Sequence, residues 1–255
     1  MGVERVEFTN SRNQTLVGNL YPADSNSIII LCHGFLSDKY SRGRFERLIK
    51  VLNKSNYNAL AFDFSGCGES DDDNITVGKE VNDLRSAIAF VKSRGYKNIA
   101  LYGHSLGTLI CLKCCTSEIV TMVLSGASTD SMHHNWNEFF TKVQMQELKE
   151  KEYITEYTPK EVRKKIIIDK QMLLDFDLIN QGEILKNVIC PILIIHGNEG
   201  EEENLLYERS KKAMPLLSND SKLEIIDGAN HSFLEHYDIL INLANDWFIK
   251  HFATK

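Results

Sequence analysis

Ser105 lies in the stretch LYGHSLGT, residues 101–108, whose residue types and spacing point most directly to chemistry. The stretch fits the pattern G-x-S-x-G, with Gly103 and Gly107 flanking the serine between an apolar run and a helical one. A serine in a tight strand-to-helix turn is held above a sheet, where its hydroxyl can attack an acyl carbonyl. The glycines remove side chains that would clash where strand and helix nearly touch. The pattern predicts a nucleophile, although the pentapeptide alone leaves an ordinary turn open as an alternative.

Two backbone amides are expected to bind the oxyanion that forms during acyl transfer. The Leu106 N–H should lie at the amino end of the helix that follows Ser105, aimed at this oxygen. The tripeptide His33-Gly34-Phe35 ends another apolar run, in LCHGFLSD. Gly34 would permit a bend there, so the Phe35 N–H is the expected second donor.

The general base should follow the nucleophile and the acid in the chain. His231 lies in DGANHSF, just after the apolar run KLEII, and a histidine in a short loop at a strand end is placed for proton transfer. Taken alone it could equally be a surface histidine. His104 and His196 lie beside other turns, where we expect them to hold the backbone.

Other chemistries find little support. Gly66-x-Gly68 lacks the third glycine of a dinucleotide fingerprint, because position 71 is Asp71. Cys111 and Cys114 form a C-x-x-C, but no second pair or histidine cluster follows at zinc-site spacing. We therefore expect no cofactor and no metal. The six cysteines lie in apolar surroundings, as buried thiols of a reducing compartment do, and a cytoplasmic location is expected.

Composition narrows the class of protein. The chain has 255 residues, 43% of them hydrophobic and 25% charged, with a net charge of −6. These values are ordinary for a soluble globular protein and argue against a general nucleic-acid binder. No apolar run approaches the ~18 residues that span a bilayer, and the amino terminus has no apolar signal segment. A small-molecule substrate is therefore the expected partner, and the oligomeric state stays open.

Short apolar runs alternate with amphipathic helical patterns along the chain. Two alternating runs, at residues 3–10 and 14–23, read as an antiparallel start of a sheet. Continuous apolar runs, typical of parallel strands covered on both faces, follow at residues 27–34, 57–64, 98–105, 120–128, 190–197 and 222–230. Helices are expected at residues 44–55, 81–95, 108–117, 205–217 and 237–252. The order predicts an α/β fold with a mostly parallel eight-stranded sheet covered by helices on both faces.

One segment, from about residue 129 to 187, breaks this alternation. It reads as polar and helical without a strand, and TPKEV suggests a helix that starts with Thr158 as its N-cap. We interpret the segment as a helical cap inserted after the sixth strand of a single domain, residues 1–255. Its apolar side chains are expected to cover Ser105 and to form an acyl or aryl pocket; they are Trp136, Phe139, Phe140, Met145, Tyr153 and Ile154.

The motifs HGF, DFSGCGES, GHSLG, HGNEG and GANHSF together resemble the α/β-hydrolase family of serine hydrolases. The most similar members are small capped esterases of the monoacylglycerol-lipase-like, cinnamoyl or feruloyl esterase-like and serine aminopeptidase-like kinds. The resemblance covers essentially the whole chain and is least specific in the cap. It implies the α/β-hydrolase fold, a Ser-His-acid triad, no cofactor, and hydrolysis through an acyl-enzyme.

The acid of this triad is the least certain residue. The family pattern HG-x-x-D, counted from His196, ends on Gly200, which has no side chain. Counting back from YERS selects Glu202 instead, as a two-residue insertion in the loop would explain. Glu202 is the expected acid, with Glu199, Glu201 and Asp130 as alternatives.

The residues and the resemblance thus predict a carboxylesterase that cleaves small, neutral or aromatic carboxylic esters rather than long triglycerides. Acylglycerol lipase, thioesterase and amidase or peptidase activities of the same fold remain alternatives. A ligand-binding homologue without catalysis is an alternative of another class, because no aspartate stands at the expected position.

Overall fold

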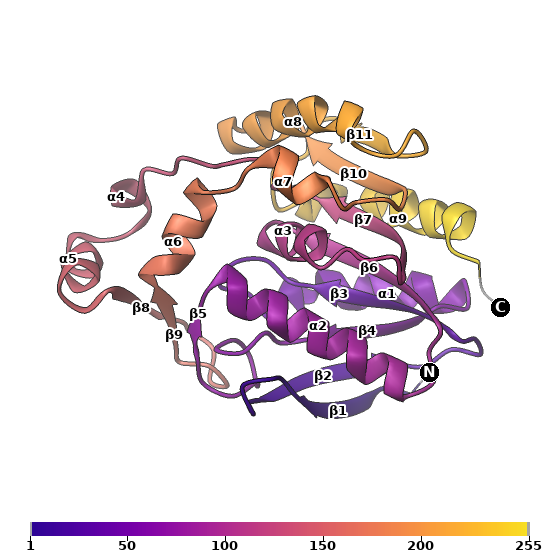
Figure 1. Cartoon of the computed structure of the whole chain (residues 1–255), viewed down its shortest axis with the longest axis horizontal. Coiled ribbons are helices and arrows are strands. Elements are labelled where there is room, and N and C mark those ends of the chain that lie inside the picture. The colour runs from indigo at the N-terminus through magenta and orange to yellow at the C-terminus, as the bar shows by residue number, and fades with distance from the viewer. Residues whose placement is uncertain (1, 254–255) are drawn as a thin grey trace.

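A computed structural model of the chain describes residues 2–253 (Figure 1). Its main sheet has eight strands in the spatial order β1-β2-β4-β3-β6-β7-β10-β11. The strands are β1 (Glu4–Thr9), β2 (Thr15–Tyr21), β3 (Ser27–Cys32), β4 (Asn58–Phe62), β6 (Asn98–His104), β7 (Ile119–Ser125), β10 (Ile192–Gly197) and β11 (Lys222–Ile226). β1 and β2 pair antiparallel, β2 joins β4 antiparallel, and the other neighbours are parallel. The predicted sheet, with its antiparallel start and six parallel strands, is confirmed.

Helices cover both faces of this sheet, as the sequence predicts. In Figure 1, α2 and α3 lie in front of it and α1 and α9 behind. The helices outside the cap are α1 (Arg44–Lys54), α2 (Val77–Ser93), α3 (Leu106–Lys113), α8 (Glu201–Ala213) and α9 (Tyr237–His251). Short 3₁₀ helices are η1 (Ser41–Gly43), η2 (Met214–Leu216) and η3 (Leu234–His236).

The alternation of side chains along β3 shows why both faces must be covered. Ile28 and Ile30 join one core cluster, packed with side chains of α2 and α3, while Ile29 and Leu31 join another, packed with α1 and α9. Successive residues of a strand point to opposite faces, so a run of four apolar residues fills two cores. All four side chains are fully buried.

The segment between β7 and β10 differs from the expected helical cap. It contains the helices α4 (Trp136–Phe139), α5 (Lys142–Lys151), α6 (Lys170–Asp177) and α7 (Gln181–Leu185), but also the antiparallel strands β8 (Tyr153–Tyr157) and β9 (Lys165–Asp169). β9 also pairs with β5 (Asn74–Ile75), which forms a second sheet of three strands. In Figure 1 most of this cap projects from one end of the main sheet.

The predicted helix after Thr158 is wrong, because this residue lies in the turn of the β8–β9 hairpin. Its N–H donates to Lys164 O at 2.9 Å, and its hydroxyl accepts the Lys160 N–H at 3.2 Å. The hydroxyl therefore stabilises a turn rather than capping a helix. YITEY and KIIID, rich in β-branched and aromatic residues, carried the strand signal that the charged flanks obscured.

All six cysteines are buried, and none of them forms a disulfide bond. Among the described residues, no helix combines the length and apolar character needed to cross a bilayer.

Candidate active site

Ser105 occupies a strained backbone position between β6 and α3. Its φ of 54° and ψ of −125° are unusual for a residue with a side chain. Such a conformation costs about 1–3 kcal/mol and persists only where the surroundings enforce it. The Ser105 N–H donates to Ser125 O at 3.0 Å, and the Ser105 carbonyl accepts the Thr108 hydroxyl at 2.6 Å. The turn therefore holds the serine hydroxyl at the carboxyl edge of the sheet.

Gly107 permits the close approach of α3 to β3 that this turn requires. A Cβ at this position would lie 2.2 Å from Cys32 O, well inside van der Waals contact. The backbone oxygen cannot move without disturbing the sheet. The structure thus gives the second glycine of the pentapeptide the steric role expected from the sequence.

His231 lies within hydrogen-bond distance of Ser105. Its Nε2 is 2.9 Å from Ser105 Oγ, and its Nδ1 is 2.6 Å from Glu203 Oε2. Gly126, at φ 58°, makes room for the imidazole ring, since a Cβ there would lie 2.7 Å from His231 Cε1. Three segments that are distant in sequence therefore contribute one continuous hydrogen-bonded chain, Ser105–His231–Glu203.

The structure brings Glu203 to His231, whereas the sequence pointed to Glu202. α8 begins at Glu201, so Glu203 is its third residue, and consecutive helical residues point about 100° apart. The Glu203 side chain is fully buried, while Glu202 is exposed. One turn of helix thus carries several carboxylates and directs one of them inward.

The alternatives to Glu202 also lie away from the histidine. Glu199 and Glu201 are exposed. Asp130 accepts the Ser131 N–H at 2.9 Å in the cap and makes no contact with His231 among the described interactions. Glu203 is therefore the carboxylate that the fold supplies.

A second histidine fixes the orientation of Glu203. His196 Nδ1 lies 2.8 Å from Glu203 Oε1, and the Gly197 N–H donates to the same oxygen at 3.0 Å. His196 Nε2 lies 2.8 Å from Ser210 Oγ, which leaves this ring fully hydrogen-bonded. His196 was expected to hold the backbone, and it holds this carboxylate instead.

Electrostatics favour an ionised Glu203 beside a basic His231. Burial tends to raise the pKa of Glu203, but hydrogen bonds from His196 and His231 outweigh it and lower the pKa to about 2. Burial alone would lower the pKa of His231. The hydrogen bond and the charge of Glu203 reverse this, so the pKa of His231 lies above the ordinary value of 6.5.

Phe35 and Leu106, whose amides are the expected oxyanion donors, belong to the loop and the helix that adjoin Ser105. Leu106 is the first residue of α3, whose opening N–H groups have no intrahelical acceptor. A Cβ on Gly34 would lie 3.7 Å from Ser105 Oγ, which shows how close this loop comes. No hydrogen-bond acceptor for either amide occurs among residues 2–253.

His33 orients the peptide that joins Gly34 to Phe35. Its Nε2 accepts the Phe64 N–H at 3.3 Å, so its Nδ1–H donates to Gly34 O at 2.9 Å. The C=O and N–H of a trans peptide point in opposite directions, and fixing the carbonyl therefore fixes the Phe35 N–H. Burial lowers the pKa of His33, in keeping with this neutral, donating tautomer.

A cavity of about 460 Å³ opens beside Ser105 and His231. The cap contributes the β8–β9 hairpin to its wall, and η1 and the start of α1 contribute two arginines. The lining residues are Gly34, Phe35, Leu36, Ser37, Arg42, Arg44, His104, Ser105, Glu156, Tyr157, Thr158, Pro159, Lys160, His231 and Ser232. Most of these residues are polar or charged, although apolar atoms supply more of the exposed wall than polar atoms do. None of the six apolar cap residues that were expected to form the pocket lines it.

The cap's aromatic residues pack with one another next to this cavity. The Phe35 ring lies 6.3 Å from Phe139 and 5.8 Å from Phe176, between ring centroids. Trp136 lies 5.9 Å from Phe140 and 5.7 Å from Phe176. These contacts join the cap to Phe35 in the loop after β3, while Phe139 stays 59% exposed. None of these aromatic cap residues lines the cavity.

A comparison with protein families identifies the family to which this fold belongs. The family model described as Hydrolase_4, serine aminopeptidase S33, matches residues 23–175. The chain belongs to this α/β-hydrolase family. No curated protein sequence matches the hydrolase.

Solved structures of similar fold extend over nearly the whole hydrolase. The α/β-hydrolase GrgF from Penicillium sp. sh18 is 18% identical, with a TM-score of 0.78 over 98% of this chain and 99% of that one. Est1E from Butyrivibrio proteoclasticus, solved with ferulic acid, is 16% identical, with a TM-score of 0.77 over 96% and 98%. The esterase Pf2001 from Pyrococcus furiosus is 21% identical, with a TM-score of 0.68 over 99% and 93%. At these identities the likeness shows the fold.

Sequence reasoning missed several residues that support the hydrolase site. Glu203 was hidden beside three other glutamates, and Gly126 carried a signal only in its position after an apolar run. Arg44, which donates to His104 Nε2 at 2.9 Å, gave no signal, because an arginine at the start of an amphipathic helix is ordinary. Burial of that arginine becomes visible only in three dimensions.

Proposed function

We propose that the protein is a serine hydrolase that cleaves carboxylic esters through an acyl-enzyme on Ser105. The observation that carries this proposal is the relay Ser105–His231–Glu203, with hydrogen bonds of 2.9 and 2.6 Å. His231 accepts the proton of Ser105 while the serine oxygen attacks the carbonyl carbon. Glu203 stabilises the resulting imidazolium and holds its tautomer.

The remaining steps use groups already present in the cavity. The Phe35 and Leu106 amides donate to the oxygen of the tetrahedral intermediate, and losing one such donor typically costs ~10²–10³ in rate. His231 then protonates the leaving alcohol, and a water molecule repeats the sequence to release the acid. Thioesters and amides would react by the same acyl-enzyme route. Acyl transfer to Ser105, rather than the atom that leaves, is therefore the core of the proposal.

The cavity favours small, soluble substrates. Its volume of about 460 Å³ and the charged side chains in its lining suit a short ester better than a long-chain triglyceride. One similar structure is that of the esterase Pf2001, and another, that of Est1E, holds ferulic acid. These likenesses support ester hydrolysis without assigning the acid or the alcohol.

The pH dependence of aryl-acetate hydrolysis tests this proposal. Only neutral His231 can accept the serine proton, and its raised pKa keeps it protonated to higher pH. We therefore expect kcat/KM for phenyl acetate to be low near pH 5.5 and to rise with pH through a midpoint above 6.5, which reports the free enzyme. Emulsified triolein is the control substrate and should be cleaved more slowly. No hydrolysis of phenyl acetate, or a rate independent of pH between 5 and 8, would contradict the proposal.

A further inference from the structure

The cavity beside Ser105 carries an imbalance of charge. Its lining holds three cationic side chains, Arg42, Arg44 and Lys160, and one carboxylate, Glu156. Lys160 is paired with Asp38, at 2.5 Å between Nζ and Oδ2. Glu156 accepts a hydrogen bond of 2.6 Å from a glutamine amide. Neither arginine has a carboxylate partner within ion-pair distance in the part of the chain that the structure describes.

Arg44 is a buried guanidinium held by neutral acceptors. Its side chain donates from Nε to Ser41 O at 2.9 Å, from Nη1 to His104 Nε2 and Ser232 O at 2.9 and 2.8 Å, and from Nη2 to Ser41 Oγ at 2.9 Å. A guanidinium has five N–H bonds, so one on Nη2 remains without an acceptor among the described residues. The residue is 7% exposed, and burial lowers its pKa without a carboxylate to oppose the effect. Buried charges are normally paired, and here the partner is missing.

A strained loop holds both arginines at the cavity. Ser41, Arg42 and Gly43 adopt φ values of 47°, 58° and 81° in succession, a left-handed run that is costly for the two residues with side chains. Asp38 Oδ1 accepts the N–H groups of Tyr40 and Ser41, at 3.0 and 3.2 Å, and fixes the loop. Backbone strain of this kind gathers at ligand-binding positions.

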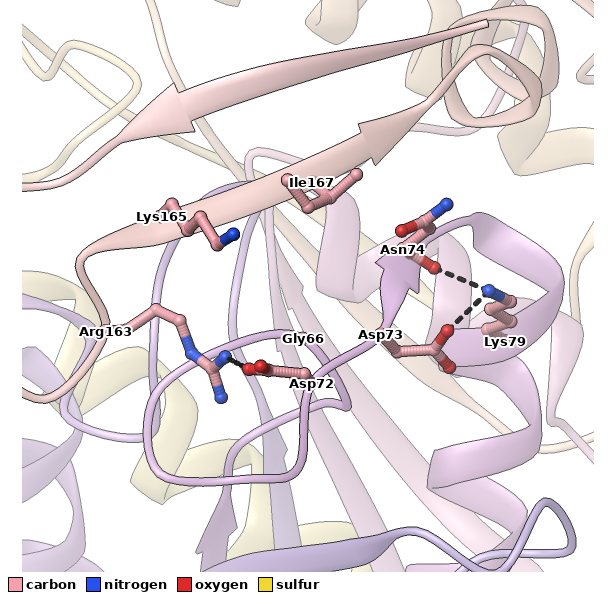
Figure 2. A pocket seen from close by; sticks show the side chains of 8 residues that line it. All are labelled: Gly66, Asp72, Asp73, Asn74, Lys79, Arg163, Lys165 and Ile167. Atoms are coloured by element: carbon pink, nitrogen blue, oxygen red, sulfur yellow. Dashed lines mark hydrogen bonds and ion pairs between the residues drawn. The ribbon is translucent and has the colours of Figure 1, made fainter. Parts of the chain in front are cut away.

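A second hollow in the structure provides the contrast. It has a volume of about 390 Å³ and lies between β9 and the loop after β4, and it also contains basic side chains (Figure 2). There Arg163 is paired with Asp72, and Lys79 with Asp73 at 2.6 Å. The Arg163–Asp72 pair joins the β8–β9 hairpin to the loop after β4, and the Lys79–Asp73 pair lies within the body of the protein. The arginines beside Ser105 have no such partner.

The position of Arg44 indicates which part of an ester it would meet. The leaving alcohol receives its proton from His231 Nε2, so the alcohol portion must lie beside this ring. Arg44 hydrogen-bonds to the carbonyl of Ser232, the next residue after His231. The arginine therefore lies on the side of the alcohol.

We propose that the substrate ester carries a carboxylate on its alcohol portion, bound by Arg44 inside the cavity and by Arg42 at its rim. This inference rests on the proposed hydrolase function. The carboxylate supplies the negative charge that the site lacks, and its oxygens can accept the remaining Nη2 hydrogen of Arg44. Arg42, which is exposed, adds a longer-range attraction.

Two esters of the same shape test the proposal: 4-acetoxybenzoate and its neutral counterpart 4-acetoxybenzamide. Each kcat/KM is divided by the rate of hydroxide-catalysed hydrolysis of the same ester, which corrects for the leaving group. We expect the parent to favour the carboxylate by about five- to tenfold at low ionic strength, as two weak ion pairs, one from each arginine, together provide. The preference should shrink in 0.5 M NaCl, where screening is strong.

Variants of the two arginines test whether these side chains cause the preference for the carboxylate ester. Arg42→Gln should lower the carboxylate preference by about threefold or more, and Arg42→Gln combined with Arg44→Gln should remove it, with thermal unfolding used to verify the fold. Arg47→Gln is the matched control, because Arg47 lies on the same helix, is paired with Asp238 at 2.7 Å and does not line the cavity. Its preference should equal that of the parent. Equal corrected rates for both esters in the parent, or an unchanged preference in the double variant, would overturn the proposal.

Calorimetry with the product separates this inference from the hydrolase function. The parent should bind 4-hydroxybenzoate more tightly than 4-hydroxybenzamide, and Ser105→Ala should do the same, since binding needs no turnover. Tighter binding of the acid in a protein that cleaves neither ester would support the anion site and reject the hydrolase. Equal binding of acid and amide in an active enzyme would reject the anion site alone.

Discussion

Ser105→Ala is expected to lower kcat for phenyl acetate on the order of 10⁵-fold or more, as loss of the nucleophile does in serine hydrolases. The alanine cannot form the acyl-enzyme, and His231 is left without a proton to accept. The fold should survive, because the only described side-chain hydrogen bond of Ser105 is the one to His231. Alanine also meets the same backbone strain at φ 54° as serine does. Steady-state rates and thermal unfolding of the purified variant measure both effects.

Retained turnover above about 1% of the parent rate in a folded Ser105→Ala variant would be incompatible with this nucleophile, given the size of the expected loss. A trace of parent enzyme can imitate such a residue of activity. Active-site titration of the variant separates contamination from genuine turnover.

Glu203→Gln is expected to lower kcat by ~10⁴-fold, the loss seen when a triad acid becomes an amide. The amide keeps nearly the same shape but removes the charge that raises the pKa of His231. It also disturbs the hydrogen bonds that Glu203 accepts from His196 and the Gly197 N–H. We expect the fold to persist at reduced stability, since a buried hydrogen-bond network is changed.

The same loop offers matched controls for this variant. Glu199→Gln, Glu201→Gln and Glu202→Gln each remove one negative charge from exposed positions within four residues of Glu203. Their rates should remain within a few-fold of the parent. A collapse of activity in Glu202→Gln, with Glu203→Gln nearly unaffected, would show that the loop adopts another register in the active protein.

The sequence predicted the parts of the fold that depend on periodicity. The apolar runs at 27–34 and 98–105 contain β3 and β6, because strands buried on both faces leave a continuous apolar signal. The cap was harder to predict. The strands β8 and β9 are short and flanked by charged residues, and the pairing of β9 with β5 is a long-range contact that no local pattern reveals.

In the candidate site, too, local motifs predict some residues, whereas long-range packing decides another. Ser105 and His231 stand in motifs whose geometry is local, a strand-to-helix turn and a loop after a strand. The acid depends on where α8 begins, and a shift of one residue rotates every side chain of a helix by about 100°. Counting residues from a neighbouring motif does not tell which of Glu202 and Glu203 points toward His231. The inward residue is set by the packing of α8 against β10.

The role of Ser105 as an activated nucleophile is tested by the intact mass of the protein after treatment with a fluorophosphonate, a reagent that reacts with activated serines. We expect one adduct per chain, mapped to Ser105 by peptide sequencing, with no adduct on Ser105→Ala and much slower labelling of Glu203→Gln. A parent protein that stays unlabelled while a known serine hydrolase in the same tube reacts, or an adduct at another residue, would contradict it.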